Sequence, residues 1–261
     1  MRLPYYEVDA FASSVFTGNP AGVCLLEQWM DDATLQGIAT ENNLSETAFL
    51  VRNSRGYDLR WFTPTTEVDL CGHATLASAF VILNCLGWRE KDITFDTRKS
   101  GRLTVMCEGD LYLMDFPSRP PSPAKCDVEL RGAFGKQPLE AYVSAEDVLL
   151  VFGSEEEIRR LKPNLAELVK IDCRGVIVTA PGLKYDFVSR FFAPRVGVPE
   201  DPVTGSAHCV LIPYWARRLG KAHLRAYQCS KRGGEVICVD RGNRVSIGGK
   251  AVIYLQGTIN I

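Results

Sequence analysis

Residues 69–75 read DLCGHAT, and residues 202–208 read PVTGSAH with the glycine in register. In both places a short polar turn with one glycine leads straight into an apolar run, at residues 76–83 and 209–215. A polar turn followed by such a run indicates the start of a buried helix. The sequence therefore predicts two matching helix starts, and the rest of the chain is organised around them.

The start of a helix is a natural anion site. Its first four or so backbone N–H groups lack partners within the helix, and the aligned peptide dipoles give that end roughly half a positive charge. Two such starts, at Gly72 and Gly205, could hold a carboxylated small molecule between them. For one turn alone, a capped and buried helix without a ligand is the simpler alternative. Because the turn occurs twice, the sequence favours a ligand-binding role over two helix caps without a ligand.

The composition narrows the classes of function. At 261 residues and 46% apolar content, the chain can form one large or two medium domains with a substantial core. The formal net charge is −1 and no block of like charge occurs, so neither a nucleic-acid partner nor a membrane partner is supported. No apolar run approaches the roughly 20 residues of a membrane span, and no signal-peptide pattern is present. We expect a cytoplasmic protein.

The nine cysteines and three histidines are scattered along the chain. The cysteines stand singly in apolar stretches without a Cys-x-x-Cys pair, whereas a zinc site or a disulfide framework would need tighter clustering. Most of them are expected to be small buried hydrophobic residues. The sequence therefore predicts no metal site.

A proline-rich stretch marks the expected domain boundary. Residues 117–123 read PSRPPSP, and so many prolines cannot join a sheet ladder or a helix. We place a first domain at residues 1–117, which a C-terminal strand at about residues 255–261 could complete. The second domain is placed at residues 118–254.

The two halves share more than the helix starts. Residues 57–64, YDLRWFTP, match residues 185–194, YDFVSRFFAP, in the Tyr-Asp pair, in an Arg-aromatic-Phe group and in the final proline. An internal duplication explains these matches with one assumption. Each half has the order strands, turn, central helix, strands. The pattern predicts two similar α+β domains with the site in the cleft between them.

Three titratable residues near the helix starts are candidates for proton transfer. Glu46 opens an otherwise apolar strand, where partial burial would raise the pKa of its carboxyl and make it a usable base near neutrality. The alternative for Glu46 is a surface carboxylate that protects a strand edge. Asp201 precedes the second turn, where it is either a second acid or only a turn-forming residue. His73 lies in the first turn of its helix, whose dipole favours a neutral imidazole, although a histidine there is more often structural.

Four ordered motifs resemble the phenazine-biosynthesis PhzF-like isomerase family. They are the DAF strand at 9–11 with TGNPAG at 17–22, NLSETAF at 43–49, DLCGHAT at 69–75 and EDPVTGSAH at 200–208. The resemblance covers essentially the whole chain. It implies the diaminopimelate-epimerase fold, an α+β fold of two pseudo-symmetric domains in which a mostly antiparallel sheet rolls around a central helix. It also implies proton transfer without a cofactor.

The family's functional residues fall on matching positions of this chain. The resemblance implies that Glu46 moves a proton between carbons of a bound acid, with His73, Asp201 and Ser206 assisting. The substrate-binding candidates lie at the two helix starts and in the TGNPAG turn: Gly72, Gly205, Thr204 and Asn19. The function implied is that of an isomerase acting on a small carboxylated metabolite, with its acid/base residue in the inter-domain cleft.

The residues at the two helix starts also distinguish a racemase with two thiols from an isomerase with one base. Related epimerases and proline racemases use a cysteine at each helix start as an acid/base pair, whereas here Cys71 is matched by Thr204. A hydroxyl is far too weak an acid to replace a thiol. The strand start that corresponds to Glu46, around residues 174–176, offers no carboxyl group either. We expect one base acting on one face of the substrate, with Cys71 as a packed bystander.

Two alternatives stay open. One is a member of the family that binds a metabolite or a protein without turnover, and proton exchange on a ligand would argue against it. The other is an epimerase or racemase of an amino or hydroxy acid, which would need a second acid/base group. Family members are often dimers, and the sequence neither supports nor excludes a homodimer.

Overall fold

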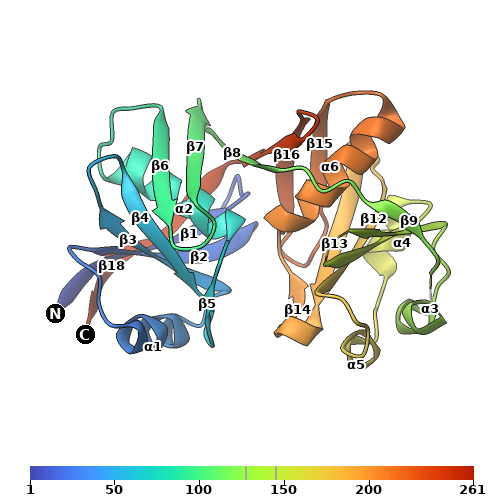
Figure 1. The fold of residues 1–261 in the computed structure, drawn as a ribbon, viewed down its shortest axis with the longest axis horizontal. Coiled ribbons are helices and arrows are strands. Elements are labelled where there is room, and N and C mark those ends of the chain that lie inside the picture. The colour runs from blue at the N-terminus through green and yellow to red at the C-terminus, as the bar shows by residue number, and fades with distance from the viewer. Residues whose placement is uncertain (127, 145) are drawn as a thin grey trace. The chain divides into compact units, whose positions relative to one another are not determined.

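The computed structural model describes residues 1–126, 128–144 and 146–261 of the protein. The chain divides into two compact units, Met1–Asp115 with Gly248–Ile261, and Phe116–Ile247. It leaves the first unit, forms the second, and returns to the first with its C-terminal strand (Figure 1). No helix among the described residues is both long and apolar enough to cross a membrane.

The first unit combines two helices with a mixed sheet. Its helices are α1 (Asp32–Asn42) and α2 (Gly72–Cys85). Its strands are β1 (Arg2–Ala10), β2 (Asn19–Leu26), β3 (Glu46–Arg52), β4 (Tyr57–Phe62), β5 (Glu67–Val68), β6 (Asp92–Thr97), β7 (Arg102–Glu108), β8 (Leu111–Pro117) and β18 (Ala251–Asn260). Strand β8 continues into the second unit.

The second unit has the same mixture of elements. Its described helices are α3 (Val128–Phe134), α4 (Glu155–Arg160), α5 (Leu165–Leu168), the 3-10 helix η1 (Pro194–Val196) and α6 (Gly205–Leu219). Its described strands are β9 (Ser122–Ala124), β10 (Glu140–Ser144), β11 (Asp147–Val151), β12 (Gly175–Pro181), β13 (Phe187–Ala193), β14 (Val198–Asp201), β15 (His223–Gln228), β16 (Gly234–Asp240) and β17 (Arg244–Gly249).

The strands of both units pair in the same order. In the first unit β1 pairs with β2 antiparallel, β2 with β3 parallel and β3 with β4 antiparallel, and β4 also pairs with β5 antiparallel and with β6 parallel. Strands β10 to β15 repeat these pairings with the same directions in the second unit. Strand β18 joins β1 antiparallel, as β9 joins β10. The repetition confirms the predicted fold class, an α+β fold with an internal duplication.

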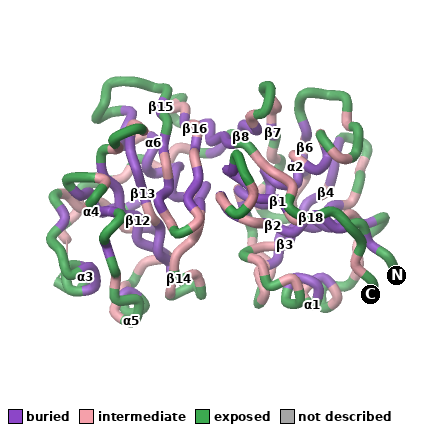
Figure 2. Tube along the Cα trace, turned by 180° about the vertical axis from the view of Figure 1, so that it is seen from behind, coloured by how far each residue is buried: buried purple, intermediate pink, exposed green. Residues whose placement is uncertain are grey.

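Helix α2 is the central helix of the first unit. Residues 73–79 are buried without interruption, which is the pattern of a helix with packing partners all round. It packs against β1, β2 and β3 (Figure 1). Helix α1, by contrast, buries only one face, at Leu35, Ile38 and Ala39 (Figure 2). The first helix start of the sequence is thus held inside its unit.

Helix α1 fixes where β3 begins. The Asp31 carboxylate caps the helix by accepting a hydrogen bond from the Thr34 N–H at 2.9 Å. Asn43 ends it in the left-handed conformation with φ 49°, a common helix stop. The chain then enters β3 within a few residues. These local signals place Glu46 at the first position of that strand.

Helix α6 is the counterpart of α2 in the second unit. It follows β14 as α2 follows β5, and Gly220, which has φ 67°, is its C-cap residue. The Trp215 ring stacks on Phe187 with centroids 5.6 Å apart, and its Nε1–H donates to the Thr179 hydroxyl at 3.0 Å. The second helix start is therefore also anchored by a buried helix.

The matching Arg-aromatic-Phe groups of the sequence form matching ion pairs. Arg60 of β4 binds both carboxylate oxygens of Glu67 in β5, at 2.7 and 2.8 Å. Arg190 of β13 binds Glu200 of β14 in the same way, at 2.7 and 2.9 Å. Each guanidinium also lies over the phenylalanine two residues further along its strand, because alternate residues share a face. The duplicated motif thus joins two neighbouring strands in each unit.

The proline-rich stretch differs from its prediction at both ends, because Pro117 is the last residue of β8. Ser122 and Pro123 belong to β9, where they pair with Val143 and Tyr142 of β10. A proline can occupy a strand whose N–H side has no ladder bond to make. The prediction that residues 117–123 join no ladder is therefore wrong.

Candidate active site

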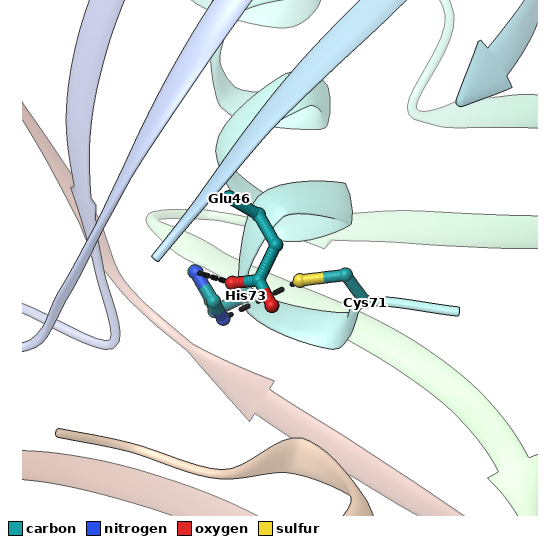
Figure 3. A group of neighbouring side chains, drawn as sticks. All are labelled: Glu46, Cys71 and His73. Atoms are coloured by element: carbon teal, nitrogen blue, oxygen red, sulfur yellow. Dashed lines mark hydrogen bonds and ion pairs between the residues drawn. The ribbon is translucent and has the colours of Figure 1, made fainter. Parts of the chain in front are cut away.

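Glu46, His73 and Cys71 come together in the first unit (Figure 3). Glu46 is the first residue of β3, Cys71 is the N-cap residue of α2, and His73 lies in the first turn of that helix. The His73 Nε2 atom is 3.2 Å from a Glu46 carboxylate oxygen, and its Nδ1 atom is 3.5 Å from the Cys71 sulfur. The Glu46 side chain is 18% exposed and that of His73 is 6% exposed. Glu46 is thus the member of the pair that a ligand can reach more easily.

His73 is a neutral imidazole at physiological pH. Burial lowers the pKa of His73 to about 3, and the backbone carbonyl of Pro20 opposes only part of that effect. The contact between Glu46 and His73 is therefore that of a carboxylate with a neutral ring. A positive imidazolium would favour the ionised carboxylate and make it a weaker base. A neutral neighbour suits a carboxylate that must accept a proton.

Asn19 stands on the other side of the imidazole. Its side chain is fully buried, and its Nδ2 atom lies 3.2 Å from His73 Nδ1. The sequence places Asn19 among the substrate-binding candidates, whereas the structure shows its amide against the histidine. The buried Cys71 thiol lies 3.5 Å from the same nitrogen and so packs against the ring as well. The ring is held between these two groups and Glu46.

The three side chains of Figure 3 also offer atoms of the types that bind zinc. One carboxylate oxygen, one sulfur and an imidazole nitrogen lie within 4.8 Å of one another. Cys71 and Glu46, however, approach different nitrogens of the ring. The shortest contacts of these two groups are thus to opposite nitrogens of the ring.

The second group of predicted residues lies at the start of α6. The Thr204 hydroxyl, at the N-cap position, donates to the Asp201 carboxylate at 2.5 Å. Gln228 of β15 accepts from the Thr204 N–H at 3.0 Å and donates to the Asp201 carbonyl oxygen at 2.8 Å. Thr204, a predicted substrate-binding residue, therefore uses its hydroxyl to hold Asp201. Gly205 is the first residue of the helix, as Gly72 is in α2.

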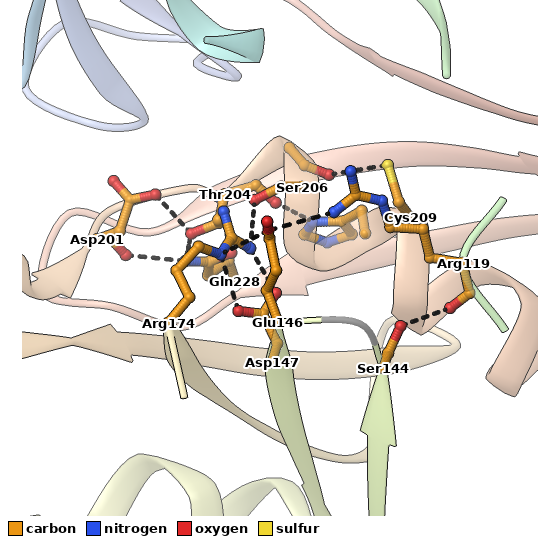
Figure 4. A network of polar contacts seen from close by, with 12 residues as sticks. Arg119, Ser144, Glu146, Asp147, Arg174, Asp201, Thr204, Ser206, Cys209 and Gln228 are labelled. Carbon is orange, nitrogen blue, oxygen red and sulfur yellow. Dashed lines mark hydrogen bonds and ion pairs between the residues drawn. The ribbon is translucent and has the colours of Figure 1, made fainter. Parts of the chain in front are cut away.

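An arginine that sequence reasoning did not single out holds Ser206 (Figure 4). Arg174 Nε donates to one carboxylate oxygen of Asp147 at 2.9 Å, and its second nitrogen donates to the other. That same nitrogen lies 3.1 Å from the Ser206 hydroxyl oxygen, which accepts from it. The Asp147 side chain is 3% exposed. The only sequence signal for this group is a charged residue directly before the apolar strand β12.

The two units differ at the position of the proposed base. Thr47 pairs with Phe62 as Val176 pairs with Phe192, so Glu46 corresponds to Gly175. A Cβ atom added at Gly175 would lie 2.3 Å from the Phe191 ring. Because the ring fills this space, the second unit has no room for a side chain where the first unit carries a carboxylate. The duplicated fold therefore carries a carboxylate at this position in one unit and no side chain in the other.

Two buried histidines predict how stability depends on pH. Burial lowers the pKa of His73 to about 3 and that of His208 to about 4, from an ordinary value of 6.5. Between the pKa of each folded histidine and 6.5, the unfolded chain binds more protons than the folded chain. The free energy of unfolding is therefore highest above pH 6.5 and falls as the pH drops, by at most about 1.4 kcal/mol per pH unit for each histidine.

Chemical denaturation at several pH values between 7.5 and 4.5 tests this dependence. The variants His73→Gln and His208→Gln should each show a shallower loss of stability with falling pH. The variant His223→Gln is the control, because His223 is exposed and should leave the slope unchanged. Equal slopes in all three variants would contradict the expected linkage.

Comparisons with known proteins agree over the whole chain. Residues 8–257 match the family described as phenazine biosynthesis-like protein, PhzC-PhzF. An uncharacterized isomerase of Pseudomonas aeruginosa is 51% identical over 261 residues and covers both chains completely. The crystal structure of a PhzF family protein from Enterococcus faecalis superimposes with a TM-score of 0.98 at 47% identity, with 100% of each chain covered. A hydroxyproline epimerase from Agrobacterium vitis shares the fold at 10% identity, with a TM-score of 0.62, 99% of this chain and 92% of that chain.

Proposed function

The chain belongs to the phenazine biosynthesis-like protein family, and we propose that it is an isomerase that moves a proton between two carbons of a small carboxylated metabolite without a cofactor. Glu46 is the acid/base residue in this proposal. The observation that carries it is the half-buried Glu46 carboxylate held 3.2 Å from a neutral imidazole. This pairing gives a base that can be reached by a ligand and is not neutralised by a positive partner.

The reaction that fits these residues is a proton shuttle by one base. The Glu46 carboxylate takes a proton from a carbon next to an electron-withdrawing group, and the electron pair of the broken C–H bond moves into that group. The protonated Glu46 then returns the proton to a different carbon, where a new C–H bond forms. Substrate and product have the same composition and oxidation level, so the sequence of steps balances without an added reactant.

The remaining candidates assist this step by binding the substrate. Gly72, the first residue of α2, offers a backbone N–H group to the substrate carboxylate, as the helix dipole favours. Gly205 offers the same group at the start of α6. In the proposal, Asp201 and Ser206 of the second unit orient the substrate by hydrogen bonds. His73 orients Glu46.

An isomerase is favoured over an epimerase by the difference between the two units. Inversion of a stereocentre by two bases needs a second acid/base group on the opposite face of the carbon. In the second unit, Gly175 occupies the position of Glu46, and Thr204 occupies the N-cap position that Cys71 has in the first unit. Neither residue is an acid/base group. The likeness to the hydroxyproline epimerase concerns the fold alone.

Deuterium exchange tests the proposed function. The purified protein is incubated in deuterated water with a panel of carboxylated compounds that includes a dihydro-hydroxyanthranilate, amino acids and hydroxy acids. NMR is expected to show deuterium entering one carbon position while a double bond moves. Exchange with inversion of a stereocentre would point to an epimerase instead. Binding across the panel without exchange would favour a member of the family that binds metabolites without turnover.

A further inference from the structure

The imidazole of His73 is surrounded by groups that differ in their ability to donate. Its Nδ1 atom faces the Asn19 amide nitrogen at 3.2 Å and the Cys71 thiol at 3.5 Å. Its Nε2 atom faces the Glu46 carboxylate at 3.2 Å. The side chains of Asn19, Cys71 and His73 are all buried, so bulk water does not satisfy these atoms. Each ring nitrogen thus has a polar group of the protein within 3.5 Å, and the Nε2 atom makes no further hydrogen bond to the described residues.

The chemistry of these partners decides where the single proton of a neutral imidazole lies. An amide –NH2 group only donates, and a thiol is a weak donor, whereas an ionised carboxylate only accepts. Because the Asn19 amide donates at Nδ1 and the Glu46 carboxylate accepts at Nε2, Nδ1 must be unprotonated and Nε2 protonated. The Pro20 backbone carbonyl, which can only accept, also lies within hydrogen-bonding reach of the ring. In a neutral histidine, the bond made by one nitrogen sets the state of the other.

We propose that Asn19 is a positioning residue, which together with the Cys71 thiol holds His73 as the neutral tautomer with its proton on Nε2, directed at Glu46. This inference rests on the proposed function only for the role of Glu46 as the base. The tautomer itself is a property of the protein without a ligand.

The tautomer has a direct consequence for Glu46. A protonated Nε2, 3.2 Å from the carboxylate, attracts it and favours one orientation of it, without the positive charge that would reduce the basicity of Glu46. The opposite tautomer would place the Nε2 lone pair against the carboxylate oxygen, and the two acceptors would repel each other. Asn19 therefore acts on the base through the histidine, as outer partners of metal-binding histidines do.

Nitrogen NMR on the unmodified protein tests the tautomer. The chain has only three histidines, so long-range proton–nitrogen correlations of the imidazoles can be assigned with the variants His208→Gln and His223→Gln. Between pH 6 and 8, the His73 ring is expected to show a protonated Nε2 and an unprotonated Nδ1. A protonated Nδ1, with or without a protonated Nε2, would overturn the proposal.

Two substitutions separate the role of Asn19 from a general effect on folding. In Asn19→Asp the new carboxylate can only accept, so the proton is expected to shift to Nδ1 or the ring to become doubly protonated. Asn42→Asp is the matched control, because Asn42 is in the same unit and its amide contacts Thr47 rather than the histidine. An unchanged His73 spectrum in Asn19→Asp would show that Asn19 does not set the tautomer.

A second measurement keeps the proposal testable if Asn19→Asp does not fold. In the unmodified protein, nuclear Overhauser contacts between the Asn19 amide protons and the His73 ring report which end of the amide faces Nδ1. Strong contacts support the donor role, and contacts missing in an otherwise assigned spectrum contradict it. None of these experiments needs a substrate, so they can fail while the exchange test of the proposed function succeeds, and the reverse.

Discussion

The variant Glu46→Gln is expected to lose between about a hundredfold and ten-thousandfold of the rate of deuterium incorporation, the range that a general base contributes. Glutamine has the size of glutamate, and its amide oxygen can still accept from the His73 ring at the same place. The fold should therefore persist while the ability to take up a proton is lost. The measurement is the initial rate of exchange by NMR, on whichever compound of the panel the unmodified protein labels.

Two controls make the result specific to the position of the base. Glu41→Gln removes a carboxylate from an exposed position in α1 of the same unit and should leave the rate unchanged. Glu46→Asp keeps the carboxylate but withdraws it by one methylene group, so an intermediate rate is expected. If Glu46→Gln labelled the substrate as fast as the unmodified protein, another residue would be the base.

The largest expected effect on stability comes from Arg174→Met. Asp147 is almost fully buried and binds the guanidinium through both carboxylate oxygens, so the variant leaves a buried charge without its partner. Removing one member of a buried ion pair costs about 3–5 kcal/mol. We expect the lower end of that range, because the Arg174 side chain is 31% exposed and water can partly replace it.

A double-mutant cycle separates the charge from the packing. The variant Arg174→Met/Asp147→Leu removes both charges, and replacement of a buried pair by apolar residues is often neutral. It should recover most of the stability that Arg174→Met loses, which would be measured as a strong coupling between the two sites. Urea denaturation measures the free energy of unfolding of the unmodified protein, the two single variants and the double variant. Amide hydrogen exchange in β11 and β12 then reports the local stability of the same four proteins. A loss below about 1 kcal/mol in Arg174→Met would show that the ion pair contributes little.

Much of the fold could be predicted because its signals are local. The Asp31 cap, the polar turns before α2 and α6, and the apolar run that follows Glu46 in β3 each depend on a few neighbouring residues. The duplication could be predicted because the Arg-aromatic-Phe groups recur in sequence, and the structure explains them as ion pairs between adjacent strands. Such features leave a pattern that a single chain reveals.

The supporting contacts of the candidate site leave no such pattern. Asn19 and His73 are 54 residues apart, and Arg174 and Ser206 are 32 apart. These pairs meet because strand pairing and helix packing bring the residues together, and neither spacing is a helical or strand period. The resemblance made Asn19 a substrate-binding candidate, and nothing in its turn indicated that its side chain contacts His73. Arg174 gave even less indication, since one charge before an apolar strand is common.

The pairing of β1 with β18 can form only after the C-terminal strand has been synthesised. Residues 2–10 of β1 are made early, but their antiparallel partners at 251–260 follow the entire second unit. A chain emerging from the ribosome can complete the second unit while one side of β1 still lacks its neighbour. An unpaired strand edge is a template for association with other chains. Nascent chains therefore expose this edge until β18 arrives, and that interval is when a chaperone would protect them most.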